Sequence, residues 1–165
     1  MTQHRKLLSG ALGVTLLLLA CSKSSSRSTE PSGQAARLSA GAWHFQHAGI
    51  DFDRDGTVDN VLPAGTLPAC VLDNAYTFFG NGTGTANDST LRCDTLPQLR
   101  PFAWAFANNE QSIDVSGAGF FGFTGRFKVH LLNDTALVVA RDTTLALPQF
   151  PQPVRGSVII NLNHQ

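Results

Sequence analysis

Four aspartates lie within nine residues in the segment Asp51-Phe52-Asp53-Arg54-Asp55-Gly56-Thr57-Val58-Asp59. Counted from Asp51, carboxylates occupy positions 1, 3, 5 and 9, and a glycine occupies position 6. This is the spacing of the first part of a calcium-binding loop, in which the glycine permits a sharp turn and oxygen atoms surround the ion. The segment therefore predicts a structural Ca²⁺ site whose ligands are Asp51, Asp53, Asp55, the carbonyl of Thr57, and Asp59.

The loop lacks one ligand of a complete calcium site, because Leu62 stands at relative position 12, where a bidentate glutamate is usual. The alternative interpretation is an acidic turn whose aspartates accept hydrogen bonds from backbone N–H groups. If calcium binds, we expect an affinity no better than about 10⁻⁴–10⁻³ M, as in extracellular modules. No other cofactor is indicated.

Residue patterns typical of enzymes are missing from the sequence. It contains no Gly-x-Ser-x-Gly, no His-Glu-x-x-His and no phosphate-binding glycine loop. His44 and His47 are three residues apart, which places them on opposite faces of a strand rather than around a shared metal. We interpret Arg126, Lys128 and His130 as the solvent-facing side of another strand. The sequence therefore predicts a protein without catalytic activity.

Strands are the elements that must position these residues, because apolar residues alternate with small or polar ones from Gly41 onward. No stretch of twelve residues shows helical spacing. The alternating runs are separated by turn signals at Asn81-Gly82, Asn108-Asn109, Gly117-Ala118-Gly119 and Asn133-Asp134. We predict that residues 41–165 form an all-β domain, a small antiparallel up-and-down β-barrel of about eight strands.

Two cysteines flank the strongest of these turn signals. If Asn81-Gly82 is a two-residue loop, Gly80 pairs with Thr83, and Cys70 and Cys93 lie equally far from that pair on either side. They would then face each other across one hairpin, with some irregularity between them and the turn, and a disulfide could join them. The alternative is a pair of free or metal-binding thiols, which no nearby Cys-x-x-Cys or histidine pair supports.

The order of these features resembles the lipocalin-like lipoprotein domains common in Bacteroidetes. The resemblance covers about residues 38–142, and the segment 144–157 departs from it. It rests on Trp43 in the first strand, Cys70, the run from Asp73 to Phe78, the turn Asn81-Gly82-Thr83, Cys93, and the strand Phe102-Ala103-Trp104. It implies a barrel of about eight strands with a capacity for small apolar ligands and no catalytic residues.

Aromatic residues supply the candidates for a ligand cavity, since an eight-stranded barrel can hold one small molecule. The alternative is a filled interior, in which case the domain would be a structural or interaction module of the cell envelope. The candidates are Trp43, Phe45, Tyr76, Phe78, Phe102, Trp104, Phe106 and Phe127.

The first 40 residues predict export and a lipid anchor. The basic His4-Arg5-Lys6 precedes a 13-residue, largely apolar run, Leu7 to Leu19, which is too short to span a bilayer comfortably. The following Leu18-Leu19-Ala20-Cys21 resembles a bacterial lipobox, which implies cleavage after residue 20 and acylation of Cys21, palmitate included. The alternative is an ordinary secretory signal. Residues 21–40 are rich in serine and predict a flexible tether.

The net charge of the chain and its predicted export limit the kinds of binding partner that we expect. Lys+Arg 12 and Asp+Glu 12 balance in the chain, so no bulk attraction to nucleic acid is expected. The predicted partners are a membrane, through the lipid anchor, and a small hydrophobic ligand or an envelope protein. The expected location is the outer membrane, on its periplasmic face.

Overall fold

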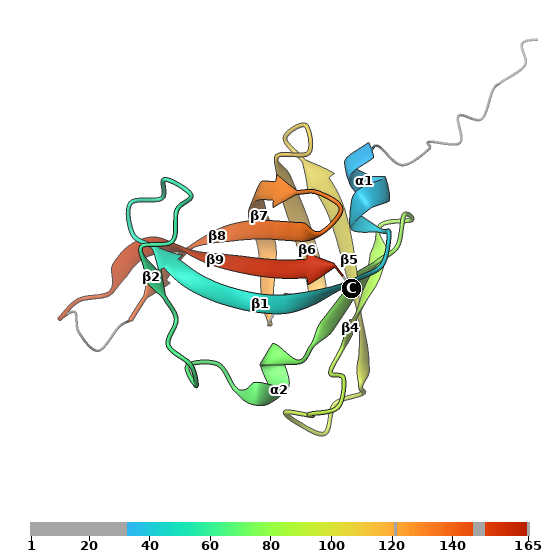
Figure 1. Cartoon of the computed structure of the whole chain (residues 1–165), viewed down its shortest axis with the longest axis horizontal. Helices are drawn as coiled ribbons and strands as arrows, with labels where there is room; N and C mark the ends of the chain where they lie inside the picture. Colours follow the sequence, from blue (N-terminus) through green and yellow to red (C-terminus); the bar gives the residue numbers. More distant parts are fainter. Residues whose placement is uncertain (1–32, 121, 147–150, 165) are drawn as a thin grey trace, which may run out of the picture.

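The computed structural model describes residues 33–120, 122–146 and 151–164 (Figure 1). Within these ranges the chain forms two short helices and nine strands. In chain order they are α1 (Gly33–Leu38), β1 (Ala42–Asp51), β2 (Asn60–Val61), α2 (Ala69–Leu72), β3 (Ala75–Phe78), β4 (Thr83–Asn87), β5 (Leu99–Ala107), β6 (Ser112–Phe120), β7 (Phe123–Leu132), β8 (Ala136–Leu145) and β9 (Val154–His164).

The sheet is antiparallel and closes on itself. From β3 to β9 each strand pairs with the next one in the chain, and β1 pairs with both β3 and β9. The two-residue strand β2 is attached to β1 alone. The result is a barrel of eight strands, which confirms the predicted fold class. Closure satisfies the backbone groups that an open sheet would leave at its edges.

The barrel core is built from the alternating side chains of its strands. In β5, for example, Phe102 and Trp104 are buried, whereas Ala103 and Ala105 are exposed. Alternation of this kind places every second side chain in the core. The largest fully buried side chains are Trp43, Tyr76, Phe78, Phe127, Leu38, Ile113, Leu137, Ile159, Ile160, Leu162 and Val139.

The folded domain begins before the predicted boundary at residue 41. Residues Gly33–Leu38 form α1, and the Leu38 side chain is fully buried in the barrel core. The Trp43 Nε1–H donates a hydrogen bond to the Leu38 carbonyl over 2.8 Å. The prediction of a flexible tether is therefore wrong for residues 33–40, because one leucine and one backbone carbonyl join this segment to the core.

The predicted two-residue loop at Asn81-Gly82 is longer by one residue. Phe78 pairs with Gly84, and the Phe79 N–H donates to the Thr83 carbonyl, so the loop consists of residues 80–82. Gly82 has a φ of +83°, which is the left-handed conformation that three-residue hairpin loops require. The predicted turn at 117–119 is instead part of β6, and the chain reverses between Phe120 and Phe123.

Residues 1–32 lie outside the described residues, and with them the predicted signal peptide, the lipidated Cys21 and the first part of the tether. In the described ranges, neither helix has the length and apolar composition needed to cross a membrane.

Candidate functional site

An apolar cavity of about 400 Å³ lies at one end of the barrel. One wall is formed by β1 and β9 and by the first residue of β7; the facing wall is the connection from β2 to α2, which passes below β1 in Figure 1. Ten of the eleven lining residues are apolar. They are Phe45, Ala48, Ile50, Leu62, Thr66, Leu67, Pro68, Val71, Phe123, Val158 and Ile160.

The predicted cavity residues lie mostly elsewhere. Of the eight aromatic candidates, Phe45 alone lines this cavity. Trp43, Tyr76, Phe78, Phe102, Trp104 and Phe127 are buried in the core, and Phe106 packs against them. The Phe78 ring lies 5.1 Å from the Phe102 ring and 5.6 Å from the Trp104 ring, measured between centroids. The prediction that these aromatics line a cavity is corrected, because edge-to-face packing fills the space between them.

The cavity wall contributed by the connection from β2 to α2 was not predicted from the sequence. Leu62, Leu67 and Val71 lie in a stretch without regular periodicity, so no strand or helix pattern marks their buried side. The available signal was weaker: several leucines and prolines stand in a long connection, where polar residues are usual.

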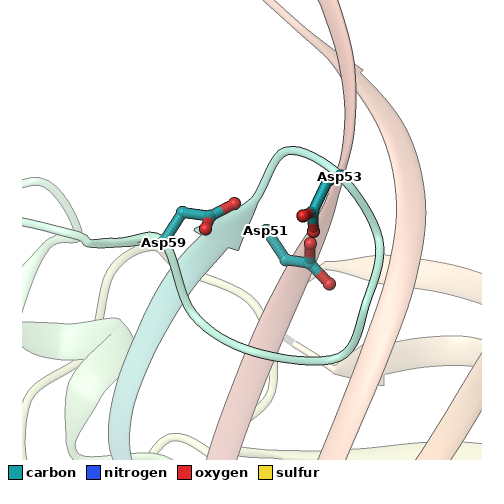
Figure 2. Close-up of side chains that lie close together, drawn as sticks. All are labelled: Asp51, Asp53 and Asp59. Atoms are coloured by element: carbon teal, nitrogen blue, oxygen red, sulfur yellow. The ribbon is translucent and has the colours of Figure 1, made fainter.

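Three of the four aspartates in the predicted calcium loop converge. Asp51, Asp53 and Asp59 each bring one carboxylate oxygen within 4.8 Å of the others. Figure 2 shows the three side chains pointing toward one another across the loop that follows β1. Asp51 is 1% exposed, whereas Asp53 and Asp59 are exposed. Three carboxylates in this arrangement can coordinate a hard divalent cation such as Ca²⁺.

The loop is held in shape by its own backbone. The Asp51 carboxylate accepts hydrogen bonds from the N–H groups of Arg54 and Gly56, and the Asp59 carboxylate accepts one from Phe52. Gly56 has a φ of +94°, which a side-chain-bearing residue rarely adopts. Both interpretations of the sequence, hydrogen-bonded turn and cation site, are compatible with this geometry.

The same contacts shift the pKa values of Asp51 and Asp53. Burial disfavours the charged form of Asp51, but hydrogen bonds from the backbone of Gly56 and Arg54 outweigh it and hold the pKa of that carboxyl below its ordinary value. For Asp53, the hydrogen bond from the Asp55 N–H favours the charged form. Desolvation and the neighbouring carboxylates oppose it, and they raise the pKa of Asp53 above its ordinary value. A divalent cation would relieve this repulsion.

Asp55 is not part of the converging group. Its carboxylate instead accepts a hydrogen bond from the Thr57 N–H over 2.7 Å, which caps the turn. The structure therefore brings together Asp51, Asp53 and Asp59, whereas the Asp55 side chain stabilises the backbone turn of the loop.

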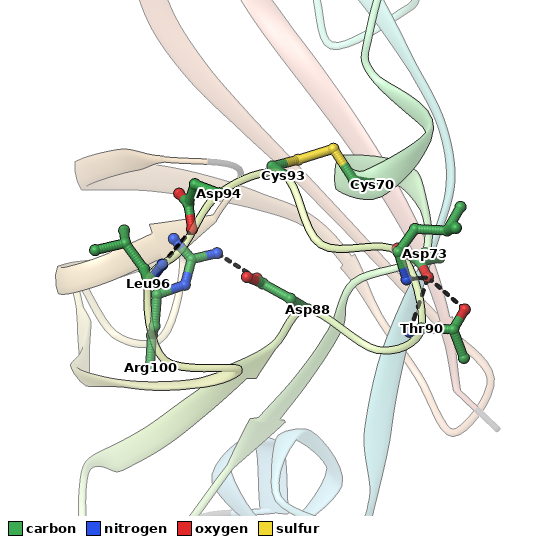
Figure 3. Close-up of a disulfide and its surroundings, with 9 residues drawn as sticks. Cys70, Asp73, Asp88, Thr90, Cys93, Asp94, Leu96 and Arg100 are labelled. Atoms are coloured by element: carbon green, nitrogen blue, oxygen red, sulfur yellow. Dashed lines mark hydrogen bonds and ion pairs between the residues drawn. A yellow bond between two sulfur atoms is a disulfide. The ribbon is translucent and has the colours of Figure 1, made fainter.

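The predicted disulfide is present. Cys70 and Cys93 are bonded, with their Cα atoms 5.2 Å apart. Cys70 lies in α2, directly beside the cavity-lining Val71, and Cys93 lies in the connection between β4 and β5 (Figure 3). The Asp73 carboxylate accepts hydrogen bonds from the backbone N–H groups of Thr90 and Leu91, which links the same two segments again. The disulfide and these hydrogen bonds fix one wall of the cavity to the neighbouring connection.

The predicted solvent-facing side of a strand belongs to β7. Arg126, Lys128 and His130 are exposed. The Arg126 guanidinium donates two hydrogen bonds to the Asp114 carboxylate, which lowers the pKa of Asp114 below its ordinary value. His44 is half-buried and His47 is exposed, and neither belongs to the carboxylate group.

Fold and site together define a class: a small closed antiparallel β-barrel with a disulfide and an apolar cavity of ligand size. Comparison of the chain with protein-family models and with curated proteins found no match.

Proposed function

We propose that this protein is a lipid-anchored lipoprotein of the bacterial cell envelope whose barrel binds one small hydrophobic molecule. The observation that carries the binding proposal is the cavity of about 400 Å³, which falls in the range of small-molecule sites, about 300–1,000 Å³. Apolar surface of this kind gains free energy by excluding water in favour of an apolar ligand. The proposal of an anchor rests on Leu18-Leu19-Ala20-Cys21 and on the short apolar run before it.

Filling the cavity is expected to abolish binding. Ala48 is 4% exposed and lines the cavity, so Ala48→Phe places a ring in the ligand's space. We expect the wild type to bind a neutral apolar fluorophore such as N-phenyl-1-naphthylamine, and Ala48→Phe to bind it at least about tenfold more weakly. A loss of that size corresponds to about 1.4 kcal/mol of binding free energy. Fluorescence titration measures both affinities, and native mass spectrometry reports any molecule that co-purifies.

The matched control is Ala103→Phe, the same substitution at an exposed position of β5. It should leave the affinity for the fluorophore unchanged. If the wild type carries no co-purified molecule and binds no apolar probe, the cavity has no ligand. The alternative function, a structural or interaction module of the envelope, would then be favoured.

We also propose that the loop after β1 binds Ca²⁺ and that the ion has a structural role. The convergence of Asp51, Asp53 and Asp59 supports this second proposal. With an affinity of about 10⁻⁴–10⁻³ M, about 10 mM calcium should stabilise the folded state by about 1.4–2.7 kcal/mol.

The double variant Asp53→Asn with Asp59→Asn should lose the rise in melting temperature that calcium gives the wild type, because two of the three carboxylates become neutral amides. Asp55→Asn is the matched control, since Asp55 lies in the same loop but outside the converging group. It should keep most of the calcium response. Thermal unfolding with calcium and with a chelator measures the response, and a wild type whose melting temperature is equal in both would contradict the proposal.

A further inference from the structure

Arg141 points into the barrel rather than out of it. Along β8 the exposure alternates, with Arg141 and Thr143 half-buried and Asp142 and Thr144 exposed. The Arg141 guanidinium carbon lies 5.3 Å from the centre of the Phe123 ring, over its face. Phe123 is a lining residue of the apolar cavity. A positive charge therefore stands beside the apolar wall of the proposed ligand site.

The cavity shares part of its wall with a second, smaller hollow that Arg141 lines. Phe123, Val158 and Ile160 line the cavity and also line a smaller hollow, whose other walls are Arg141 and Thr143. In the sheet, Arg141 is paired directly with Val158 of β9. None of the eleven residues that line the cavity itself is charged, and Arg141 is the charged residue of the adjoining hollow.

Among the described residues, no carboxylate pairs with Arg141. Arg37, Arg100 and Arg126 each have a partner, which is Asp134, Asp88 and Asp114 respectively. The adjacent Asp142 faces the outside of the barrel, where its carboxylate lies 4.0 Å from the Lys128 ammonium. A guanidinium that lies over an aromatic face still has its N–H donors free in its own plane, in the fork geometry that suits a carboxylate.

We propose that the ligand is a single-chain amphiphile with an anionic head group, a medium-chain fatty acid or a close analogue. Its carboxylate would accept hydrogen bonds from Arg141, and its chain would lie in the cavity against Phe45, Val158 and Ile160. This inference rests on the proposed function, because it names the class of molecule that the cavity binds. A volume of about 400 Å³ lies low in the range of small-molecule sites and favours one short chain over a two-chain lipid.

The experiment compares two probes that share a chain and differ in the head group: decanoate and decanol. Isothermal titration calorimetry with the wild type should show tighter binding of decanoate. Arg141→Gln should weaken decanoate at least about tenfold, as expected for the loss of a charge-assisted hydrogen bond, and change decanol by less than about twofold. Binding of decanol by the variant also shows that its cavity is intact.

Arg155→Gln is the matched control, because Arg155 is an exposed arginine of β9 with the same charge. It should leave the affinity for decanoate unchanged. The inference is overturned if Arg141→Gln binds decanoate as the wild type does, if Arg155→Gln loses as much affinity as Arg141→Gln, or if the wild type does not prefer decanoate over decanol. If the wild type binds neither probe, both this inference and the proposed ligand-binding function are wrong.

Discussion

Replacing Trp43 with alanine is expected to destabilise the folded state by about 3–5 kcal/mol, the usual cost of removing a large buried aromatic side chain. Trp43 is fully buried in β1, the strand that closes the barrel by pairing with both β3 and β9. Its ring lies 5.1 Å from the ring of His164, and its Nε1–H is bonded to the Leu38 carbonyl. The substitution therefore leaves a void where β1 closes the barrel and removes one of the two contacts that join α1 to the core.

Urea unfolding, followed by far-ultraviolet circular dichroism, measures the loss as a lower transition midpoint. Trp43→Phe keeps most of the apolar volume but removes the hydrogen bond, so it should cost about 1–2 kcal/mol. Phe79→Ala is the exposed control, since Phe79 is 44% exposed, and should cost less than about 0.5 kcal/mol. Equal unfolding midpoints for Trp43→Ala and Phe79→Ala would show that the stability of the closed barrel does not depend on Trp43.

The barrel was predictable because its strands alternate and its turns carry recognisable residues. Phe102 and Trp104 face inward and their neighbouring alanines outward, as the period of two requires. The helix α1 was not predictable from the same signals, because it has six residues and a single buried side chain, Leu38. A segment that short has no periodicity, and its position depends on the burial of Leu38 and on a hydrogen bond from Trp43, which follows it in the chain.

The glycines of residues 117–119 predict a turn that the structure places further along the chain, between β6 and β7. Gly117 and Gly119 have φ values of +84° and +60°, but they lie in a register irregularity of β6 rather than in a turn. A Cβ atom on Gly119 would clash with the Phe123 carbonyl oxygen, so the close approach of the two backbones requires glycine there. The sequence shows that glycines are needed here, but it does not show whether they form a turn or an irregularity within a strand.

The candidate site was only partly predictable. The spacing of the aspartates identified a loop in which three carboxylates converge, but not that Asp55 would be used to cap the turn. The aromatic residues identified the core rather than the cavity, because large rings pack against one another wherever the barrel is narrow enough. The cavity depends on the path of the connection from β2 to α2, which no local pattern specifies.

The disulfide was predicted correctly, although the strand register from which it was predicted is wrong by one residue. Cys70 and Cys93 were expected on paired strands, yet Cys70 lies in α2 and Cys93 lies in the irregular connection after β4. The pairing survives because both segments leave the β3–β4 hairpin at the same end, so their distance from the turn is similar. Symmetry about a hairpin therefore indicates proximity even where the strands have already ended.

Removing this disulfide with Cys70→Ala and Cys93→Ala is expected to destabilise the protein by about 3 kcal/mol. The bond joins residues separated by 23 positions, and a loop of that length restricts the unfolded chain by roughly this amount. The double variant should still fold, because the hydrogen bonds from Thr90 and Leu91 to Asp73 continue to link the two segments. Urea unfolding of the oxidised wild type, the reduced wild type and the double variant measures the cost.

The disulfide should also affect the cavity, because Val71 follows Cys70 directly and lines the cavity wall. Once the bond is lost, α2 is held less firmly, and the affinity for an apolar probe should fall in the double variant and in the reduced wild type alike. Agreement between these two samples separates the loss of the bond from any effect of the alanines. If both keep the wild-type affinity while the unfolding midpoint drops, the bond stabilises the barrel without holding the cavity wall in place. If the midpoint does not move either, the hydrogen bonds to Asp73 are sufficient to join the two connections.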